Sequence, residues 1–184
     1  MIGFGTVGQN LAKILESKKK QLLREFGFHP RIVAVVDTTG AMIDPKGLDS
    51  NRTLAVKQAK GSVAQDPELG RLGMDAQEVI ERVEAEVVLE LTPTRIVDGE
   101  PALSHIKAAL RSRRHVITTN KAPLAIAMPS LMEMASYNKA LLKFSGTVGG
   151  GTPILDFARK CLNGNRIKSV RAAGRPAGLV SSVG

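Results

Sequence analysis

The sequence predicts a doubly wound α/β fold, in which a mostly parallel β-sheet carries helices on both faces. Short β-branched runs alternate along the chain with segments whose apolar residues follow helical spacing. These runs are apolar almost throughout, as expected for strands covered on both sides. At 184 residues the chain is long enough for one sizeable core, and no internal repeat or low-complexity linker interrupts the alternation.

The amino-terminal part predicts strand, helix, strand. Residues 1–2 are the remnant of a first strand, and we expect residues upstream, because such strands commonly have about five. Apolar residues at 7, 11, 14, 15, 22 and 26 predict one long helix, and RIVAVVD at 31–37 predicts the second strand. Residues 38–67 are the least regular part, with a short helix expected near 52–60.

The alternation continues to residue 162. Asp75 and Glu78 form a capping-box pattern that predicts a helix at 75–83, followed by a buried strand at 86–92. Pro101 opens the next predicted helix, which leads to a strand at 115–120. We then expect the APLA loop, a helix at 129–140, a strand at 141–148, and a helix in TPILDFARKCL at 152–162.

The stretch GFGTVG at 3–8 has the spacing of a dinucleotide-binding loop. Gly3, Gly5 and Gly8 would permit the tight turn, the approach of a pyrophosphate, and the packing of helix on strand. The phosphates would lie at the amino terminus of the helix beginning near Thr6, where free N–H groups favour negative charge. Between a strand and a helix, this motif predicts a Rossmann-like domain that binds NAD or NADP.

Asp37, at the end of the second predicted strand, is the candidate for recognising the adenosine ribose. A carboxylate there accepts a hydrogen bond from the 2′-OH and repels a 2′-phosphate, which indicates NAD. Arg52 and Lys57 on the following excursion could instead pair with a 2′-phosphate, or they could lie on a surface helix. NAD and NADP therefore both remain open.

Three predicted strands end in unusually polar segments: LTPT at 91–94, TTNK at 118–121 and GTVGGG at 146–151. In open α/β sheets, ligands bind beyond the carboxyl ends of the strands. Lys121 occupies such a position and is therefore the candidate proton-transferring group, although a lone lysine is more often an ordinary surface residue.

Four motifs follow one another as they do in homoserine dehydrogenases: GFGTVG, ELTPTR with DGEPALSHIKAAL, HVITTNKAPLA, and GTVGGGTPIL. From residue 2 to about residue 170 the chain resembles that family. The resemblance implies an NAD(P)-dependent oxidoreductase that interconverts L-homoserine and L-aspartate 4-semialdehyde in threonine and methionine biosynthesis. It also implies a homodimer.

The same resemblance implies roles for individual residues. Phe4, Thr6 and Val7 would contact the cofactor's phosphates, and Thr92 with Pro93 would lie near the nicotinamide. Lys121 would contact cofactor and substrate as one of two lysines implicated in proton transfer.

The second glycine-rich stretch would serve another purpose. In several members of the family its carbonyls hold a monovalent cation such as Na⁺. By position, the carbonyls in this chain would be those of Val148, Gly150 and Thr152. Many members have a glutamate ligand where this sequence has Ser145. The alternative is a tight turn that needs no ion.

We expect three parts: an NAD(P)-binding domain at 1–150, a linker helix and strand at 151–171, and a returning segment at 172–184. We expect the substrate and dimerisation domain of the family, with its second lysine, to be missing between Val170 and the returning segment. The returning segment would bring Gly174 to the cofactor. A non-catalytic NAD(H) sensor is the alternative function.

Composition narrows the partners. Lys and Arg number 26 against 17 Asp and Glu, a net charge of +9, but the basic clusters at 18–20 and 111–114 sit in or beside amphipathic helix patterns and are expected to be solvated faces. Trp is absent, so a stacking surface for single-stranded nucleic acid is not expected. A lone Cys161, expected to be buried, suits a reducing compartment. We expect a cytoplasmic protein with a small-molecule substrate and no nucleic-acid or membrane partner.

Overall fold

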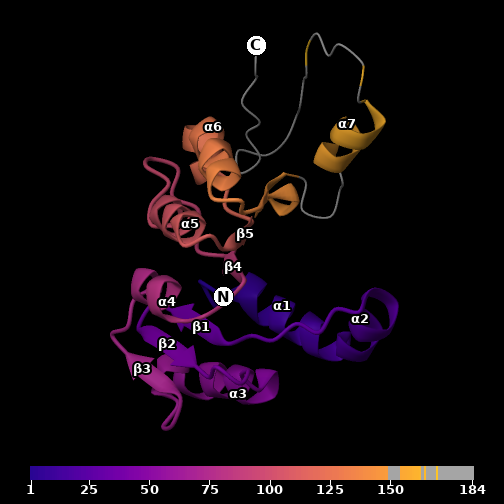
Figure 1. Cartoon of the computed structure of the whole chain (residues 1–184). Helices are drawn as coiled ribbons and strands as arrows, with labels where there is room; N and C mark the ends of the chain where they lie inside the picture. The colour runs from indigo at the N-terminus through magenta and orange to yellow at the C-terminus, as the bar shows by residue number, and fades with distance from the viewer. Residues whose placement is uncertain (149–153, 163, 165–168, 170–184) are drawn as a thin grey trace.

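The computed structural model describes residues 1–148, 154–162, 164 and 169, and it confirms the α/β fold with a mostly parallel sheet (Figure 1). The strands are β1 Ala34–Asp37, β2 Gly40–Ile43, β3 Gly70–Leu72, β4 Val87–Glu90, β5 His115–Thr118 and β6 Leu142–Lys143. The helices are α1 Thr6–Ser17, α2 Lys19–Phe26, α3 Ser50–Lys60, α4 Ala76–Arg82, α5 Ala102–Arg111, α6 Ala122–Tyr137 and α7 Ile154–Cys161, with short 3₁₀ turns η1 Val63–Gln65 and η2 Ser145–Thr147.

Ile2 joins two three-stranded sheets. It forms parallel bridges to Val36 of β1 and to Glu90 of β4, which gives the spatial order β3-β2-β1-Ile2-β4-β5-β6. The strands β4, β5 and β6 are parallel, whereas β2 is antiparallel to β1 and β3 is antiparallel to β2. The predicted first strand is thus central to the sheet.

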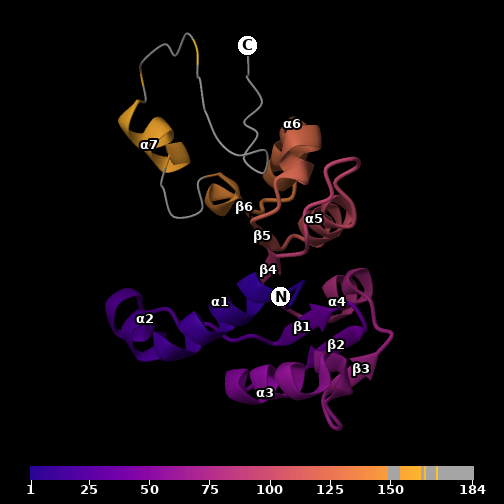
Figure 2. The same cartoon turned by 180° about the vertical axis from the view of Figure 1, so that it is seen from behind.

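Each face of the sheet buries its own apolar cluster. Ala34 and Val36 pack with residues of α4, α5 and α6, while Val35, between them, packs with residues of α1 and α3. Figures 1 and 2 show α4, α5 and α6 on one side of the molecule and α1 with α2 on the other. Because both faces are covered, the strands are continuous apolar runs rather than alternating ones.

The prediction of an irregular excursion at 38–67 was wrong in part. The helix near 52–60 is present as α3, but the chain first reverses through Thr38 and Thr39 so that β2 pairs with β1. Gly40 makes this reversal possible: its φ is 149°, and an added Cβ would lie 2.2 Å from the carbonyl oxygen of Arg71. The edge of the sheet is therefore an antiparallel meander.

Two helix predictions also need correction. The long first helix is broken at Lys18 into α1 and α2. The expected APLA loop after Lys121 is the first turn of α6, which starts seven residues before the predicted position at 129. Pro129 lies inside that helix, and the backbone departs from helical geometry at Ala127, so the proline marks a kink rather than a start.

The carboxyl-terminal predictions were only partly right. The strand predicted at 141–148 is shorter than expected, because only β6 is a strand and the 3₁₀ turn η2 follows it. Helix α7 confirms the helix expected within 152–162, although Cys161 is exposed rather than buried. In the part of the chain that is described, no helix is long and apolar enough to cross a membrane.

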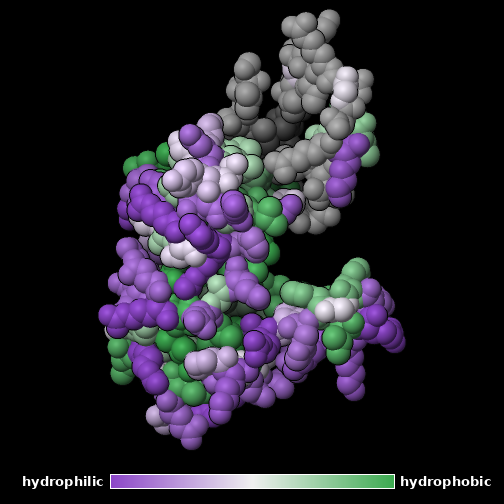
Figure 3. Space-filling model, viewed as in Figure 1, coloured by the Kyte–Doolittle hydropathy of each residue, from purple (hydrophilic) through white to green (hydrophobic). Residues whose placement is uncertain are grey.

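Lys18, Lys19 and Lys20 are all exposed, as predicted for a solvated face. Figure 3 shows apolar residues gathered along the projecting α1 and α2 region. Helix α2 has no buried residue, and Leu23 and Phe26 are 53% and 73% exposed. This helix therefore contributes little to the core.

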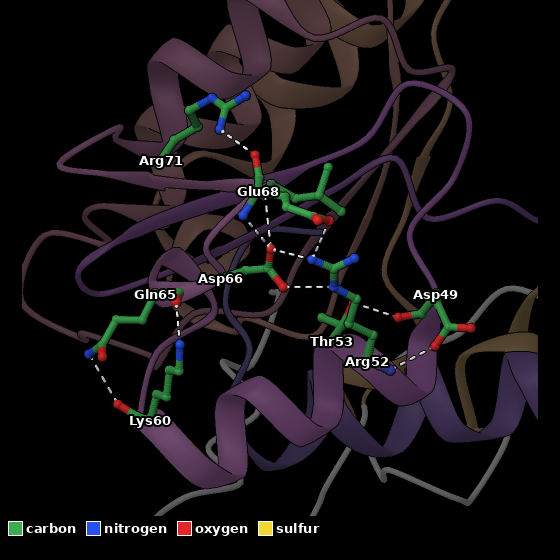
Figure 4. A network of polar contacts seen from close by, with 9 residues as sticks. Asp49, Arg52, Thr53, Lys60, Gln65, Asp66, Glu68 and Arg71 are labelled. Carbon is green, nitrogen blue, oxygen red and sulfur yellow. Dashed lines mark hydrogen bonds and ion pairs between the residues drawn. The ribbon is translucent and has the colours of Figure 1, made fainter.

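An ion pair ties α3 to the loop before β3 (Figure 4). Arg52 donates from Nε and Nη2 to the two carboxylate oxygens of Asp66 at 2.8 Å, and Nη2 also reaches Glu68 at 2.8 Å. The Asp66 side chain is 1% exposed. The hydrogen bonds from Arg52, together with backbone N–H groups of Leu69 and Glu68, lower the pKa of Asp66 to about 2.

Asp66→Asn is expected to destabilise the fold in a pH-dependent manner. A carboxyl whose pKa is lowered on folding stabilises the native state at any pH above the pKa it has in the unfolded chain. That contribution is lost as the pH falls through the lower pKa of the folded state. The difference in melting temperature between wild type and variant should be full at neutral pH and vanish between about pH 4 and pH 2. Glu68→Gln is the matched control, since Glu68 is 71% exposed; an equal effect from it would contradict this account.

Candidate functional site

One large cleft lies where the parallel strands end. Its volume is about 1240 Å³, and segments that follow Ile2, β1, β4, β5 and β6 all contribute to its wall. Its lining includes Gly3, Phe4, Gly5, Thr6, Val7, Asp37, Lys57, Thr92, Pro93 and Lys121. Ten predicted site residues, from segments far apart in the sequence, therefore share one cleft.

The glycine loop forms the base of this cleft. Gly3 has φ +90° and lies so close to the residue that follows β4 that an added Cβ would be 2.8 Å from the backbone of Leu91. Gly8 packs under the loop, where a Cβ would lie 2.6 Å from the carbonyl oxygen of Gly3. Gly5 faces open space, since an added Cβ would have no atom within 4 Å, and it precedes the first residue of α1 without a capping side chain. The first-turn N–H groups of α1 are thus left for a ligand.

Phe4 and Val7 differ in how they reach the cleft. Phe4 is only 1% exposed, so its side chain belongs to the core and its contribution to a ligand would be mainly its backbone. Val7 is 51% exposed at the cleft wall.

Asp37 lies at the cleft, but its carboxylate is already hydrogen-bonded within the protein. Oδ2 accepts from Lys57 Nζ at 2.8 Å and from the Val63 N–H at 2.9 Å, while Oδ1 accepts from Thr39 and Ser62. The side chain is 4% exposed. Burial by itself would raise the pKa of Asp37, but these hydrogen bonds, led by that from Lys57, lower it below its ordinary value. A ribose hydroxyl would have to join or displace these donors.

Of the two basic residues predicted to face the ribose from segment 38–67, one lies at the cleft and the other does not. Lys57 lines the cleft and neutralises Asp37. Arg52 is held by Asp66 and Glu68 and is not part of the cleft lining. Of the two predicted partners for a 2′-phosphate, the structure brings only Lys57 to the cleft.

Lys121 sits between β5 and α6, where it is the residue that immediately precedes the helix. It is exposed at the cleft, which Thr92 and Pro93 also line from the loop after β4. Asn120, buried next to it, donates from Nδ2 to the carbonyl oxygens of Thr92 and Pro93 at 3.2 and 3.4 Å. Two of the three predicted polar strand ends are therefore hydrogen-bonded to each other.

Sequence reasoning missed a buried polar group beneath these loops. Glu90, the last residue of β4, is fully buried and accepts hydrogen bonds from Thr92 and Thr118. His105 of α5 lies beside it and lines the cleft. A glutamate at the end of the apolar run EVVLELT was the signal that could have revealed it, because a charge is buried in a strand only when it is paired or hydrogen-bonded.

The predicted cation site is only partly within the described residues. Val148 is described and half-buried, whereas Gly150 and Thr152 fall outside, as does Gly174 of the predicted returning segment. Among the residues that the structure describes, no group of three or more His, Cys, Asp or Glu side chains could hold a metal ion.

Comparison with known families agrees with the geometry of the cleft. Residues 3–144 match the family model described as the NAD-binding domain of homoserine dehydrogenase. The chain belongs to the homoserine dehydrogenase family. The matched range covers the glycine loop, Asp37 and Lys121 together.

Individual homoserine dehydrogenases show the extent of the likeness. The enzyme of Methanocaldococcus jannaschii is 38% identical over 93% of this chain, and an NAD(+)-dependent homoserine dehydrogenase of Pseudomonas canavaninivorans is 35% identical over 91%. The chain spans about half the length of these curated relatives, 50% and 47%. A hyperthermophilic archaeal homoserine dehydrogenase mutant in complex with NADPH superposes with a TM-score of 0.76 at 28% identity, over 88% of this chain and 47% of that one.

Proposed function

We propose that the full-length protein oxidises L-homoserine to L-aspartate 4-semialdehyde, reversibly, with NAD or NADP as hydride acceptor. The observation that carries this is the convergence of the glycine loop, the Thr92 loop and Lys121 on one cleft, in a chain of the homoserine dehydrogenase family. Residues 1–150 would be the NAD(P)-binding domain.

The cleft fits a dinucleotide. The open space above Gly5 and the uncapped amino terminus of α1 suit a pyrophosphate, which needs close backbone approach and N–H donors. The cofactor, when bound, supplies the hydride-accepting nicotinamide. Thr92 and Pro93 would orient it, since they line the cleft on the side of Lys121.

Lys121 supplies the charge that the chemistry needs. In the oxidation, the hydroxyl of homoserine must lose its proton as the hydride leaves the hydroxymethyl carbon. In the reverse reaction, negative charge develops on the carbonyl oxygen as the hydride arrives. The amine form of Lys121 would take up the hydroxyl proton at Nζ in the oxidation, and the ammonium so formed would stabilise the alkoxide and return the proton in the reduction, an effect that is strongest in a cleft from which water is excluded.

The remaining chain would complete the enzyme. Residues 151–171 would lead to a substrate and dimerisation domain, and residues 172–184 would return with Gly174 to the cofactor. A homodimer in the cytoplasm and a Na⁺ site at the carbonyls of Val148, Gly150 and Thr152 belong to the same proposal. Small-molecule substrates are the partners it requires, with no role for nucleic acid or membrane.

Reduction of NAD or NADP by the full-length protein on addition of L-homoserine tests the function. Turnover with L-homoserine, and none with L-serine as the shorter homologue, is the expected result. Saturable NADH binding measured by fluorescence, without turnover on either alcohol, would overturn the enzyme proposal in favour of the NAD(H) sensor.

Lys57→Met is expected to shift the cofactor preference toward NAD. With Lys57 removed, the Asp37 carboxylate loses its neutralising charge and repels a 2′-phosphate more strongly. The ratio of the NADPH to the NADH dissociation constant should rise roughly tenfold, about 1.4 kcal/mol. Lys60→Met on the same helix is the control, because Lys60 is exposed and bonds the Gln65 carbonyl instead. An unchanged ratio in Lys57→Met would rule out this role.

A further inference from the structure

The buried carboxylate of Glu90 has no place in the proposed chemistry, yet it lies directly beneath the cleft. The residue is 0% exposed at the carboxyl end of β4. A carboxylate in such a position costs much free energy unless donors surround it. The donors around Glu90 therefore offset the cost of its burial, and these contacts indicate what it does.

Each contact of the Glu90 carboxylate leads to a wall of the cleft. Oε1 accepts from the Thr92 N–H at 3.1 Å and from the Thr92 hydroxyl, and Oε2 accepts from the Thr118 hydroxyl at 3.1 Å. The Thr118 hydroxyl in turn accepts from the Asn120 N–H at 3.0 Å, one residue before Lys121. One carboxylate thus holds both the loop that would face the nicotinamide and the turn that carries the lysine.

His105 approaches the same carboxylate from α5. Its Nδ1 lies 3.8 Å from Oε1 of Glu90, and the residue is 8% exposed. An unprotonated Nδ1 would direct its lone pair at a carboxylate oxygen, so the favoured tautomer carries the hydrogen on Nδ1. His115 provides the opposite case, because its Nδ1 accepts the Leu141 N–H at 3.0 Å and must be unprotonated.

We propose that Glu90 is a positioning residue, which fixes Thr92 and the turn before Lys121 by hydrogen bonds, and which sets the orientation of the nearby His105 imidazole by its charge. The proposal rests on the dehydrogenase function proposed above. Glu90 itself is fully buried, so it acts through these neighbours rather than on the substrate. Its effect should therefore lie in the precision of the reacting geometry.

Glu90→Gln in the full-length protein tests this role, because glutamine preserves the shape and removes the charge. One carboxylate oxygen, which accepts a hydrogen bond, is replaced by an NH₂ group. That group cannot accept a hydrogen bond from the donor that it faces. We expect kcat to fall about 10- to 100-fold, as for a misplaced reacting group, while KM for L-homoserine and the NADH dissociation constant change less than about threefold. Glu86→Gln is the matched control, since Glu86 precedes the same strand and is exposed.

A second variant guards against loss of folding. Thr118→Val removes the hydroxyl that joins Glu90 to β5, and it should reproduce the fall in kcat. If both substitutions act through one hydrogen bond, the double variant should be no slower than the slower single variant. Melting temperatures of all four proteins show whether each is folded.

The tautomers give a readout that does not depend on turnover. The imidazole ¹⁵N signals would be recorded by NMR in the cofactor-free full-length protein and assigned from the signals that disappear in His105→Gln and His115→Gln. They should show hydrogen on Nδ1 of His105 and on Nε2 of His115. A wild type without homoserine turnover would refute the function but leave this tautomer pair intact. Full kcat in folded Glu90→Gln, or hydrogen on Nε2 alone in neutral His105, would overturn the positioning role.

Discussion

Lys121→Met is expected to lower kcat/KM for L-homoserine by about 10²- to 10⁴-fold, the range typical of a proton-transferring group. Methionine retains the length of the side chain and removes the nitrogen that would take up the hydroxyl proton and, once protonated, stabilise the alkoxide. Lys121 is exposed beside the cleft, and no carboxylate of the described residues forms an ion pair with it, so folding should not depend on its charge. The melting temperature should stay within a few degrees of wild type.

Two comparisons make this result specific. Lys13→Met, on the exposed side of α1, removes the same charge away from the cleft and should leave kcat/KM unchanged. NADH binding by Lys121→Met should weaken far less than turnover. A variant that retains more than a tenth of wild-type kcat/KM would show that Lys121 is not the proton-transferring group.

Gly5→Ala is expected to leave the fold intact and to weaken NADH binding by about tenfold or more. Its backbone, φ −82°, is open to alanine, and no protein atom lies within 4 Å of the added Cβ. That methyl group would occupy the space through which a pyrophosphate approaches the backbone, and overpacking of this kind costs about 1–3 kcal/mol. A fluorescence titration with NADH measures the loss.

Gly8→Ala should have the opposite effects: it should destabilise the fold more than it weakens NADH binding. Its Cβ would lie 2.6 Å from the Gly3 carbonyl oxygen, so helix α1 must shift and the free energy of unfolding should fall by about 1–3 kcal/mol. Chemical denaturation of both variants separates the two roles. If Gly5→Ala bound NADH as tightly as wild type, the cofactor could not lie over this loop.

The fold was predictable where local pattern and tertiary environment agree. Asp75 does accept the Glu78 N–H, as the capping box predicted, and the apolar runs are strands because helices cover both faces. The β1–β2 reversal was missed because it depends on Gly40 packing against the distant Arg71 carbonyl. The start of α6 was predicted seven residues too late, since that helix continues through a kink at Ala127.

The site was predictable where a motif fixes backbone geometry, as at Gly3, Gly5 and Gly8. The hydrogen bonding of Asp37 was not, because its four donor residues come from α3, from η1 and the residue that caps it, and from the β1–β2 turn, which only the folded chain brings together. The same holds for Glu90, whose partners Thr118 and His105 lie on other elements.

Transfer of deuterium tests the central claim most directly. The full-length protein would be given L-homoserine deuterated at its hydroxymethyl carbon, together with NAD or NADP, and the reduced cofactor would be analysed by mass spectrometry. We predict reduced cofactor that carries one deuterium, formed at a rate that Lys121→Met sharply reduces. Absence of deuterium in the cofactor, with NADH still bound by the wild type, would contradict hydride transfer in this cleft.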